Sequence, residues 1–468
     1  MLFNSIEFLF FFVFVTSAFF LLPHKYRWML LLGASCFFYM FFKPVYILIL
    51  VFTIIIDYWA GIWIEKEEEV KKRKLLLIVS LVSNIGVLAV FKYFNFLNDN
   101  ITSIANYFGV ENKIPYLNIL LPIGLSFHTF QAMSYTLEVY YKRQKAERHF
   151  GIYALYVMFY PQLVAGPIER PQNILHQFYE KKTFSYENAV SGLNLIAIGL
   201  FKKVVIADRL AVYVNQVYGD INNASSISTF LAACFFSIQI YCDFSGYSDV
   251  ARGTARFMGY ELMINFDKPY LSQSISEFWT RWHISLSTWF KDYLYIPLGG
   301  NRVEKWKWLR NLMIVFVVSG IWHGASWTFV IWGALHGLYL IFAIVTQSTR
   351  DKWLPSLGVL NKPLNQLTVF LLVTLAWIFF RAESFPKAML IIEKIVEMDF
   401  SFNLVQICAE KGPLNLLLTF VCVILWAIIS LPKENVSPKH NIAFLLSITF
   451  LIVILGRNEG GAFIYFQF

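Results

Sequence analysis

Two histidines stand in an otherwise apolar run, "SGIWHGASWTFVIWGALHG", residues Ser319–Gly337. Neutral imidazole titrates near pH 6.5 and can take a proton from a hydroxyl, as acyl transfer to an alcohol requires. A histidine in a membrane segment is costly unless it has a partner or faces water, so it is a candidate functional residue. The alternative is a hydrogen bond across a helix interface, which is as plausible for His323 and is favoured for His336.

The glycines of the same run predict how its helices pack. Gly320 with Gly324, and Gly333 with Gly337, are small residues four apart, a spacing that lets two helix backbones approach closely. If the run is one continuous helix, the step from His323 to His336 turns the chain by about 220°. On that assumption the two histidines face different surroundings.

A third histidine, His283 in "RWHISLS", is the second candidate for proton transfer. On a continuous helix His283 shares a face with Ser287, and Arg281 shares one with Ser285. The alternative is an interfacial histidine beside tryptophans. His283 and His323 flank one predicted span, which favours a shared site.

Asp243 lies in "IQIYCDFSGYSDVARG", one turn after Gln239 and near the end of a predicted span. A carboxylate at this depth must be paired or face water. It either orients a histidine or arginine, or fixes the end of the helix, and the structural role is favoured.

The composition indicates the elements that position these residues. Of 468 residues, 57% are hydrophobic and 15% are charged. A typical globular protein has about 25% charged residues. With a mean hydropathy of +0.56, this composition indicates a polytopic all-α membrane protein.

The charge and the cysteines narrow the class further. The net charge of +9 is typical of cytoplasmic loops and contacts with anionic lipid, and does not suggest nucleic acid. Five cysteines without a CxxC pair suggest buried apolar side chains, and no metal site is implied.

About eleven to thirteen membrane segments are expected, and the first apolar run (8–22) is interpreted as a retained span, not a signal peptide. Charged loops are predicted at 65–74 and 141–149, the latter on the cytoplasmic side together with 201–209. The predicted spans are 5–22, 27–42, 45–64, 75–92, 117–141, 150–167, 188–207, 227–249, 311–345 (alternatively a hairpin), 366–381, 413–431 and 440–456.

Two segments do not fit simple spans. Residues 264–310 are too polar to cross a membrane and too rich in tryptophan for an ordinary loop, which predicts an interfacial or re-entrant segment. The last six residues, "FIYFQF", are either a frayed tail or an insertion that places the Tyr465 hydroxyl inside the bundle. Spacing alone does not decide between these.

Five motifs in order resemble the membrane-bound O-acyltransferase (MBOAT) family. They are "LPIGLSFHTFQAMSY", "FYPQLVAGPIERP", "YCDFSGYSDVARG", "EFWTRWHISLSTWFKDYLYIPLGGN" and "WHGASWTFVIWGALHG". They are similar to its bacterial branch, which acts on alginate, peptidoglycan, wall polysaccharides and teichoic acids. The resemblance implies one MBOAT domain over 1–468, with re-entrant helices at 264–310 around a central funnel or tunnel and a tail motif at 457–468.

The resemblance also implies an activity: an O-acetyltransferase in a bacterial cytoplasmic membrane, acting on an extracytoplasmic polysaccharide. The donor would be cytosolic acetyl-CoA, with no permanently bound cofactor, and the implied partners are membrane lipids and an extracytoplasmic SGNH-type acetyltransferase. His323 matches the catalytic histidine, His283 the second signature histidine, and Tyr465 a proposed intermediate acyl acceptor. The residues expected to line the site are Asp243, Ser287, Trp322, Trp282 and Arg281.

Two residues depart from the family pattern, His128 where an aromatic residue is more usual and Lys291 where arginine is common. His128 would add a polar group to a cavity. The alternative function is a transporter or flippase with His323, Asp243 and His283 along its pathway. The absence of a visible internal repeat argues against it. A third interpretation is a scaffold for a secreted transferase, in which the histidines are structural.

Overall fold

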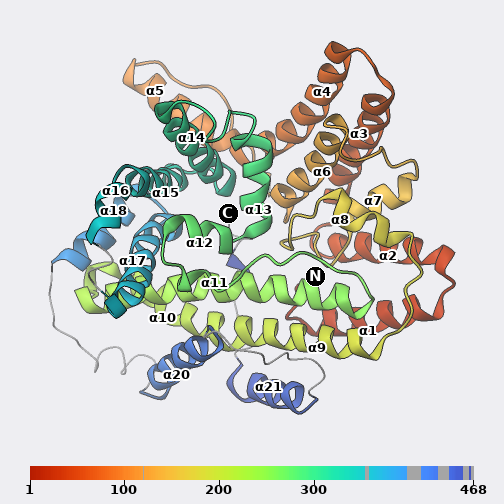
Figure 1. The fold of residues 1–468 in the computed structure, drawn as a ribbon. Helices are drawn as coiled ribbons and strands as arrows, with labels where there is room; N and C mark the ends of the chain where they lie inside the picture. Colours follow the sequence, from red (N-terminus) through yellow and green to blue (C-terminus); the bar gives the residue numbers. More distant parts are fainter. Residues whose placement is uncertain (120, 354–357, 398–412, 431–441, 457–462, 465–468) are drawn as a thin grey trace. The chain divides into compact units, whose positions relative to one another are not determined.

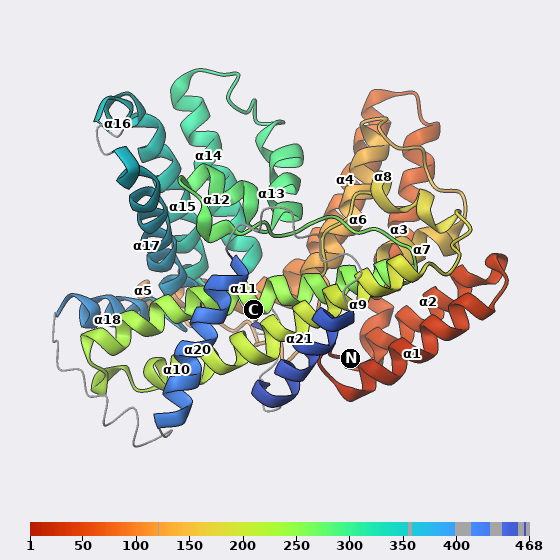
Figure 2. The same ribbon diagram turned by 60° about the horizontal axis from the view of Figure 1, so that its bottom comes forward.

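In a computed structural model, the described residues of this chain form helices and no strands (Figures 1 and 2). The description covers residues 1–468 except 120, 354–357, 398–412, 431–441, 457–462 and 465–468. They group into two compact units, each assembled from separate stretches of the chain.

The first unit contains Met1–Ile196 and Tyr247–Met263. Three of its helices, α3, α4 and α6, pack against one another and share a buried polar network. Asp57 of α3 accepts hydrogen bonds from Ser80 Oγ (2.6 Å) and Asn84 Nδ2 (2.8 Å) of α4. The helices are α1 (Ile6–Leu21), α2 (His24–Met40), α3 (Ile47–Lys66), α4 (Val70–Leu88), α5 (Phe94–Tyr107), α6 (Leu125–Tyr140), α7 (Phe150–Met158), α8 (Pro171–Ile174), most of α9 (Tyr186–Leu200), and the short η1 (Pro44–Tyr46), η2 (Ala89–Tyr93) and η3 (His176–Phe178).

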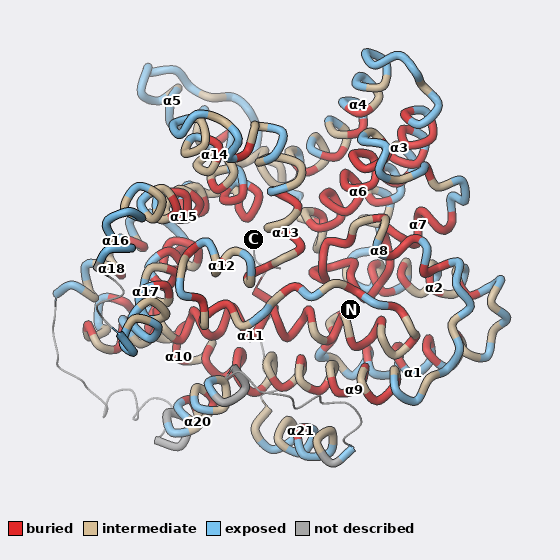
Figure 3. Tube along the Cα trace, in the orientation of Figure 1, coloured by how far each residue is buried: buried red, intermediate tan, exposed pale blue. Residues whose placement is uncertain are grey.

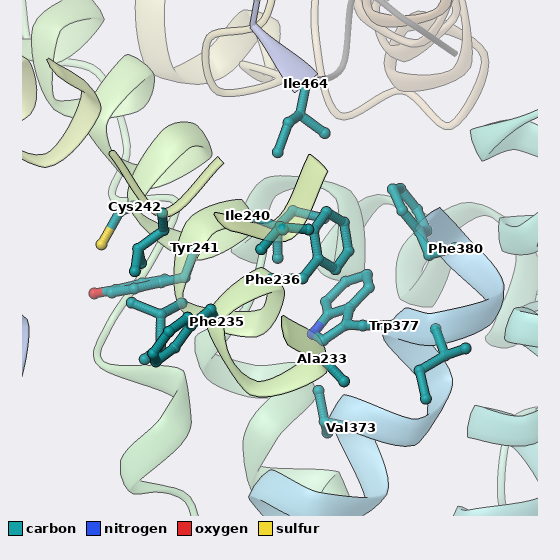
Figure 4. Packing of buried hydrophobic residues seen from close by; sticks show 14 of the residues in the cluster. Ala233, Phe235, Phe236, Ile240, Tyr241, Cys242, Val373, Trp377, Phe380 and Ile464 are labelled. Carbon is teal, nitrogen blue, oxygen red and sulfur yellow. The ribbon is translucent and has the colours of Figure 1, made fainter. Parts of the chain in front are cut away.

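The second unit contains Ala197–Gly246 and most residues from Ile264 onward. Its core lies where α11 meets α17, and the part of α11 in this unit is mostly buried (Figures 3 and 4). Its elements are η4 (Phe201–Ala207), α10 (Asp208–Gly219), η5 (Ile221–Asn223), the first part of α11 (Ser226–Phe257), η6 (Pro269–Leu271), α12 (Ile275–Arg281), α13 (Ile284–Phe290), η7 (Lys291–Tyr295), α14 (Lys305–His323), α15 (Trp327–Val345), α16 (Gln347–Trp353), α17 (Asn361–Arg381), α18 (Phe385–Val396), α20 (Pro413–Ser430) and α21 (Ile442–Leu455).

Six helices of the described chain are long and apolar enough to cross a membrane, and three shorter helices are apolar, in agreement with a multi-pass membrane protein. Fewer helices qualify than the sequence pattern predicted, because several predicted spans form short helices; α7, within 150–167, has nine residues. The six are Pro44–Lys66, Val70–Tyr107, Tyr186–Gly219, Ser226–Phe257, Trp327–Val345 and Gly358–Arg381, and the shorter three are Ile6–Leu21, Leu417–Ala427 and Phe444–Leu455.

The charged residues at 201–209, which were predicted to lie on the cytoplasmic side, are helical. They belong to the continuous helical stretch Tyr186–Gly219, in which Phe201–Ala207 is wound as a π-helix. Lys203 pairs there with Asp208 and Asp243. These buried charges therefore neutralise one another inside the protein.

Residues 311–345 form the hairpin alternative, α14 followed by α15, and not one long helix. The two helices lie side by side because glycines face each other at their contact. A Cβ on Gly333 would overlap the Phe316 carbonyl oxygen and lie 3.2 Å from the Gly320 Cα. A Cβ on Gly320 would overlap the Phe329 carbonyl oxygen. The predicted close helix contact is confirmed, and it joins one glycine from each predicted pair.

None of the six helices long and apolar enough to cross a membrane lies in the segment 264–310, and the segment is not one continuous helix. Two seven-residue helices, α12 and α13, are separated by Trp282 and His283. His283 has φ 44° and ψ 55°, a left-handed conformation that is rare outside glycine. The turn at the end of the segment has Gly299 at φ 101° and Gly300 at φ 56°. A side chain would be strained at both positions.

Replacing Gly333 by alanine tests the contact between α14 and α15. The new methyl group meets backbone atoms that cannot rotate away. We therefore expect a loss of about 1–3 kcal/mol of stability. Thermal unfolding in detergent measures this. The matched control is Gly33→Ala in α2, where a Cβ has no atom within 4 Å and the apparent Tm should not fall. Equal Tm values for the two variants would contradict the packing described.

Candidate active site

His323 is the last residue of α14 and lies in an aromatic enclosure. The helix ends at this residue, and Ser326 begins α15 by accepting a hydrogen bond from the Thr328 amide. The imidazole is buried, with its centroid 4.8 Å from the Trp332 ring and 5.4 Å from the Phe380 ring, both edge-on. The side chain is therefore shielded from bulk water by apolar walls.

His283 is held by a polar contact that determines its tautomer. Asn265 Oδ1 accepts the Ser285 backbone N–H at 3.1 Å, so this side-chain atom is an oxygen. The same oxygen lies 3.1 Å from His283 Nδ1, which must therefore donate. Complete burial lowers the pKa of His283 to about 3, because the charged ring would lose its hydration. The neutral ring thus has its proton on Nδ1 and its lone pair on Nε2, the atom able to accept a proton.

One indole ring contacts both histidines. The Trp322 centroid is 4.8 Å from that of His323 and 6.4 Å from that of His283. Trp322 is itself buried. Two side chains capable of proton transfer therefore border a single aromatic ring in one compact unit, although they belong to different helical segments. This arrangement suits general base catalysis with water excluded.

His336 occupies a structural position. Since the helix is not continuous, the expected angular separation does not apply, and His323 and His336 both pack against Trp332. Trp279 donates its indole N–H to His336 Nδ1 at 3.3 Å. Because this histidine accepts a hydrogen bond from a neighbouring segment and is fully buried, the favoured structural interpretation describes its contacts well.

The expected pairing of Arg281 with Ser285 is wrong, because the helix breaks at Trp282 and His283. His283, in contrast, is the N-cap residue of the short helix that contains Ser287. Arg281 pairs with Glu277 at 2.9 Å and not with Ser285. The Ser287 hydroxyl donates to the Trp282 carbonyl at 3.1 Å, and its amide donates to the His283 carbonyl. Ser287 and Arg281 thus stabilise the ends of the two short helices. The Trp282 ring lies in the core, 5.0 Å from the Trp377 ring.

Asp243 is paired, as its depth required, but with a lysine. Lys203 Nζ lies 2.6 Å from Asp243 Oδ1, and the Ile464 amide donates to Oδ2 at 2.7 Å. Tyr465, the predicted acyl acceptor, lies outside the described residues. The two residues before it, Phe463 and Ile464, are buried, with exposed fractions of 3% and 7%.

His128 lies in the first unit, where its Nε2 is 2.6 Å from Thr53 Oγ1 of α3. This departure from the family pattern is thus a polar contact between α6 and α3. In the described part of the chain, no group of three or more His, Cys, Asp or Glu side chains is placed to hold a metal ion.

Sequence reasoning missed Asn265 and the role of Lys203. Asn265 lies in an irregular segment 18 residues before His283, and no spacing rule links the two. Lys203 carried a signal, since a lysine inside an apolar helix requires a carboxylate partner, and Asp243 had the complementary requirement.

Comparisons with known proteins agree with the motifs. The model of the family "MBOAT, membrane-bound O-acyltransferase family" matches residues 49–382, a range that includes His283 and His323. Probable alginate O-acetylase AlgI of Pseudomonas aeruginosa is 38% identical over 418 residues, 89% of this chain and 78% of that protein. Peptidoglycan O-acetyltransferase of Helicobacter pylori is 34% identical over 493 residues, which cover 94% of this chain and 91% of that protein. Teichoic acid D-alanyltransferase of Bacillus subtilis is 28% identical over 256 residues, which cover 52% of this chain and 64% of that protein.

Replacing Asn265 by alanine tests the support of His283. The change leaves the Ser285 amide and His283 Nδ1 without this acceptor in a buried position. We therefore expect the free energy of unfolding to fall by about 2 kcal/mol or more. Ser285→Ala removes only a hydroxyl donor to the same oxygen. Its expected cost is smaller, about 0.5–1.5 kcal/mol. Denaturant unfolding in detergent compares the two. Equal losses would show that Asn265 does not organise this cluster.

Proposed function

Because the chain belongs to the membrane-bound O-acyltransferase family, we propose that it transfers acetyl groups from cytosolic acetyl-CoA to hydroxyls of an extracytoplasmic polysaccharide. The protein is a multi-pass membrane O-acyltransferase. The observation that carries the catalytic assignment is the contact of His323 and His283 with the same buried Trp322 ring.

The proposed chemistry needs one base and a dry site. The acceptor hydroxyl attacks the thioester carbonyl carbon while His323 takes its proton. The carbon–sulfur bond breaks, the proton passes to the CoA thiolate, and an ester and free CoA are formed. His283 orients or polarises the reacting groups through its Nε2. The aromatic walls around His323 keep water from hydrolysing the thioester.

The first acceptor in this proposal is the Tyr465 hydroxyl or a serine of a partner protein. The partner is an extracytoplasmic SGNH-type acetyltransferase, which the family resemblance implies. The burial of Phe463 and Ile464, which directly precede Tyr465 in the sequence, supports Tyr465 as this acceptor. The proposed location is the bacterial cytoplasmic membrane.

The relatives that match most of the chain support the proposed polymer class. Their names refer to alginate and peptidoglycan, both rich in sugar hydroxyls, and they cover more of this chain than the D-alanyltransferase does. We therefore propose acetyl as the transferred group and an exopolysaccharide or wall glycan as the acceptor.

His323→Ala should lower acyl transfer from acetyl-CoA by about 10²–10⁴-fold, the usual contribution of a general base. The assay is thioester consumption and acceptor acetylation by purified protein in proteoliposomes. The control is His176→Ala, an exposed histidine of the first unit, which should retain full activity. Full activity of folded His323→Ala would refute the catalytic assignment.

The same proteoliposomes test the transporter alternative. Movement of an intact substrate without any dependence on acyl-CoA would favour that class. If the protein is a scaffold, substitution of a histidine should lower acceptor acetylation only as far as it lowers the abundance of the protein.

Tyr465→Phe tests the relay separately. The change removes only the hydroxyl, so we expect acceptor acetylation to fall at least tenfold while the protein keeps its abundance and its affinity for acetyl-CoA. Unchanged acetylation would remove the relay step and leave direct transfer to the partner's hydroxyl.

A further inference from the structure

An ionic cluster inside the second unit holds the end of the described chain. Lys203, in the π-helical segment η4, lies 2.8 Å from Asp208 and 2.6 Å from Asp243. Both carboxylates are buried, Asp243 with 1% exposed. A buried carboxylate is tolerated only when its oxygens have partners. Asp243 uses one oxygen for the lysine and the other for the backbone amide of Ile464.

The side chains on both sides of that amide are packed into the same unit. The Phe463 ring lies 5.6 Å from the Phe244 ring. Ile464 belongs to the core cluster with Ile240 of α11 and Trp377 of α17, and Figure 4 shows it at the top of this cluster. Residues 463–464 are therefore bound by one charge-assisted hydrogen bond and two apolar side chains.

A second contact fixes the segment where it leaves α21. Arg209 donates to the Leu455 carbonyl, the last residue of that helix, at 2.7 Å. Lys203 and Arg209 belong to the same helical stretch, Tyr186–Gly219. This stretch thus anchors the C-terminal segment at Leu455 directly and at Ile464 through Asp243.

The docked end is adjacent to the candidate active site. Phe244 contacts Phe463 and also the His283 ring, at a centroid distance of 4.7 Å. The Phe463 ring is therefore separated from the His283 ring by a single aromatic side chain.

We propose that Lys203 and Asp243 form a docking site for the C-terminal segment of this chain at Ile464, and that this docking is required for the acceptor step assigned to Tyr465. The second part rests on the proposed function. Asp243 acts here as a positioning residue, through the Ile464 amide. Because it binds a backbone group, the anchor does not depend on the side chain at position 464.

Hydrogen–deuterium exchange of the full-length protein in lipid nanodiscs tests the docking. The Ile464 amide should be protected in the wild type, and Asp243→Ala should speed its exchange at least tenfold. Asp243→Asn keeps an acceptor oxygen, so it should give an intermediate rate and remains informative if the alanine variant does not fold. The matched control is Asp249→Asn, a carboxylate of the same helix that pairs with Arg252. Wild-type exchange in Asp243→Ala, or loss of protection in Asp249→Asn, would overturn the proposal.

Kinetics separate positioning from a general structural role. In Asp243→Asn, we expect kcat for acceptor acetylation to fall at least tenfold while KM for acetyl-CoA stays within twofold. A rise of KM with unchanged kcat would overturn the positioning role. Because amide exchange does not depend on chemistry, a fully active His323→Ala variant would refute the proposed function and leave the docking result standing.

Discussion

The close approach of α14 and α15 at Gly320 and Gly333 determines the geometry of the candidate site. Without side chains at these positions, the two helices meet backbone to backbone, and the chain turns between them at 324–326. His323 therefore lies at a helix end, where Trp332 of the opposite helix forms one wall of its enclosure. Larger residues would separate the helices and open this enclosure. In a membrane, where apolar burial does not drive helices together, such close packing supplies the attraction.

The second physical theme is the treatment of polar groups in an apolar interior. Asn265, Asp243 and Asp57 are buried, and each accepts hydrogen bonds from neighbouring segments. Each of these contacts joins parts of the chain that are distant in sequence. A buried polar group without a hydrogen-bond partner costs more free energy than one such hydrogen bond contributes to stability. Arrangements of the helices that break these hydrogen bonds are therefore disfavoured. The same contacts set the tautomer of His283 and hold the chain end.

Much of the fold and of the candidate site could be predicted from the sequence, because the signals lie within short stretches of the chain. The apolar composition predicted the membrane fold, and the motifs around His283 and His323 predicted family membership. The glycine spacing predicted a close helix contact. These signals are local. The break of the helix at His283 was not predictable, because the left-handed residue there lies at a tertiary contact with Asn265, 18 residues earlier. The pairing of Lys203 with Asp243 was not identified, because the two residues lie on different helical segments.

The central claim is that His323 acts directly on the thioester. A structure of the protein in lipid with a non-hydrolysable acetyl-CoA analogue tests it most directly. The account predicts the analogue's carbonyl beside His323, within hydrogen-bond reach of about 2.6–3.2 Å or one water molecule away, and against the Trp322 ring. An analogue bound elsewhere, with the His323 ring still enclosed by Trp332 and Phe380, would contradict it.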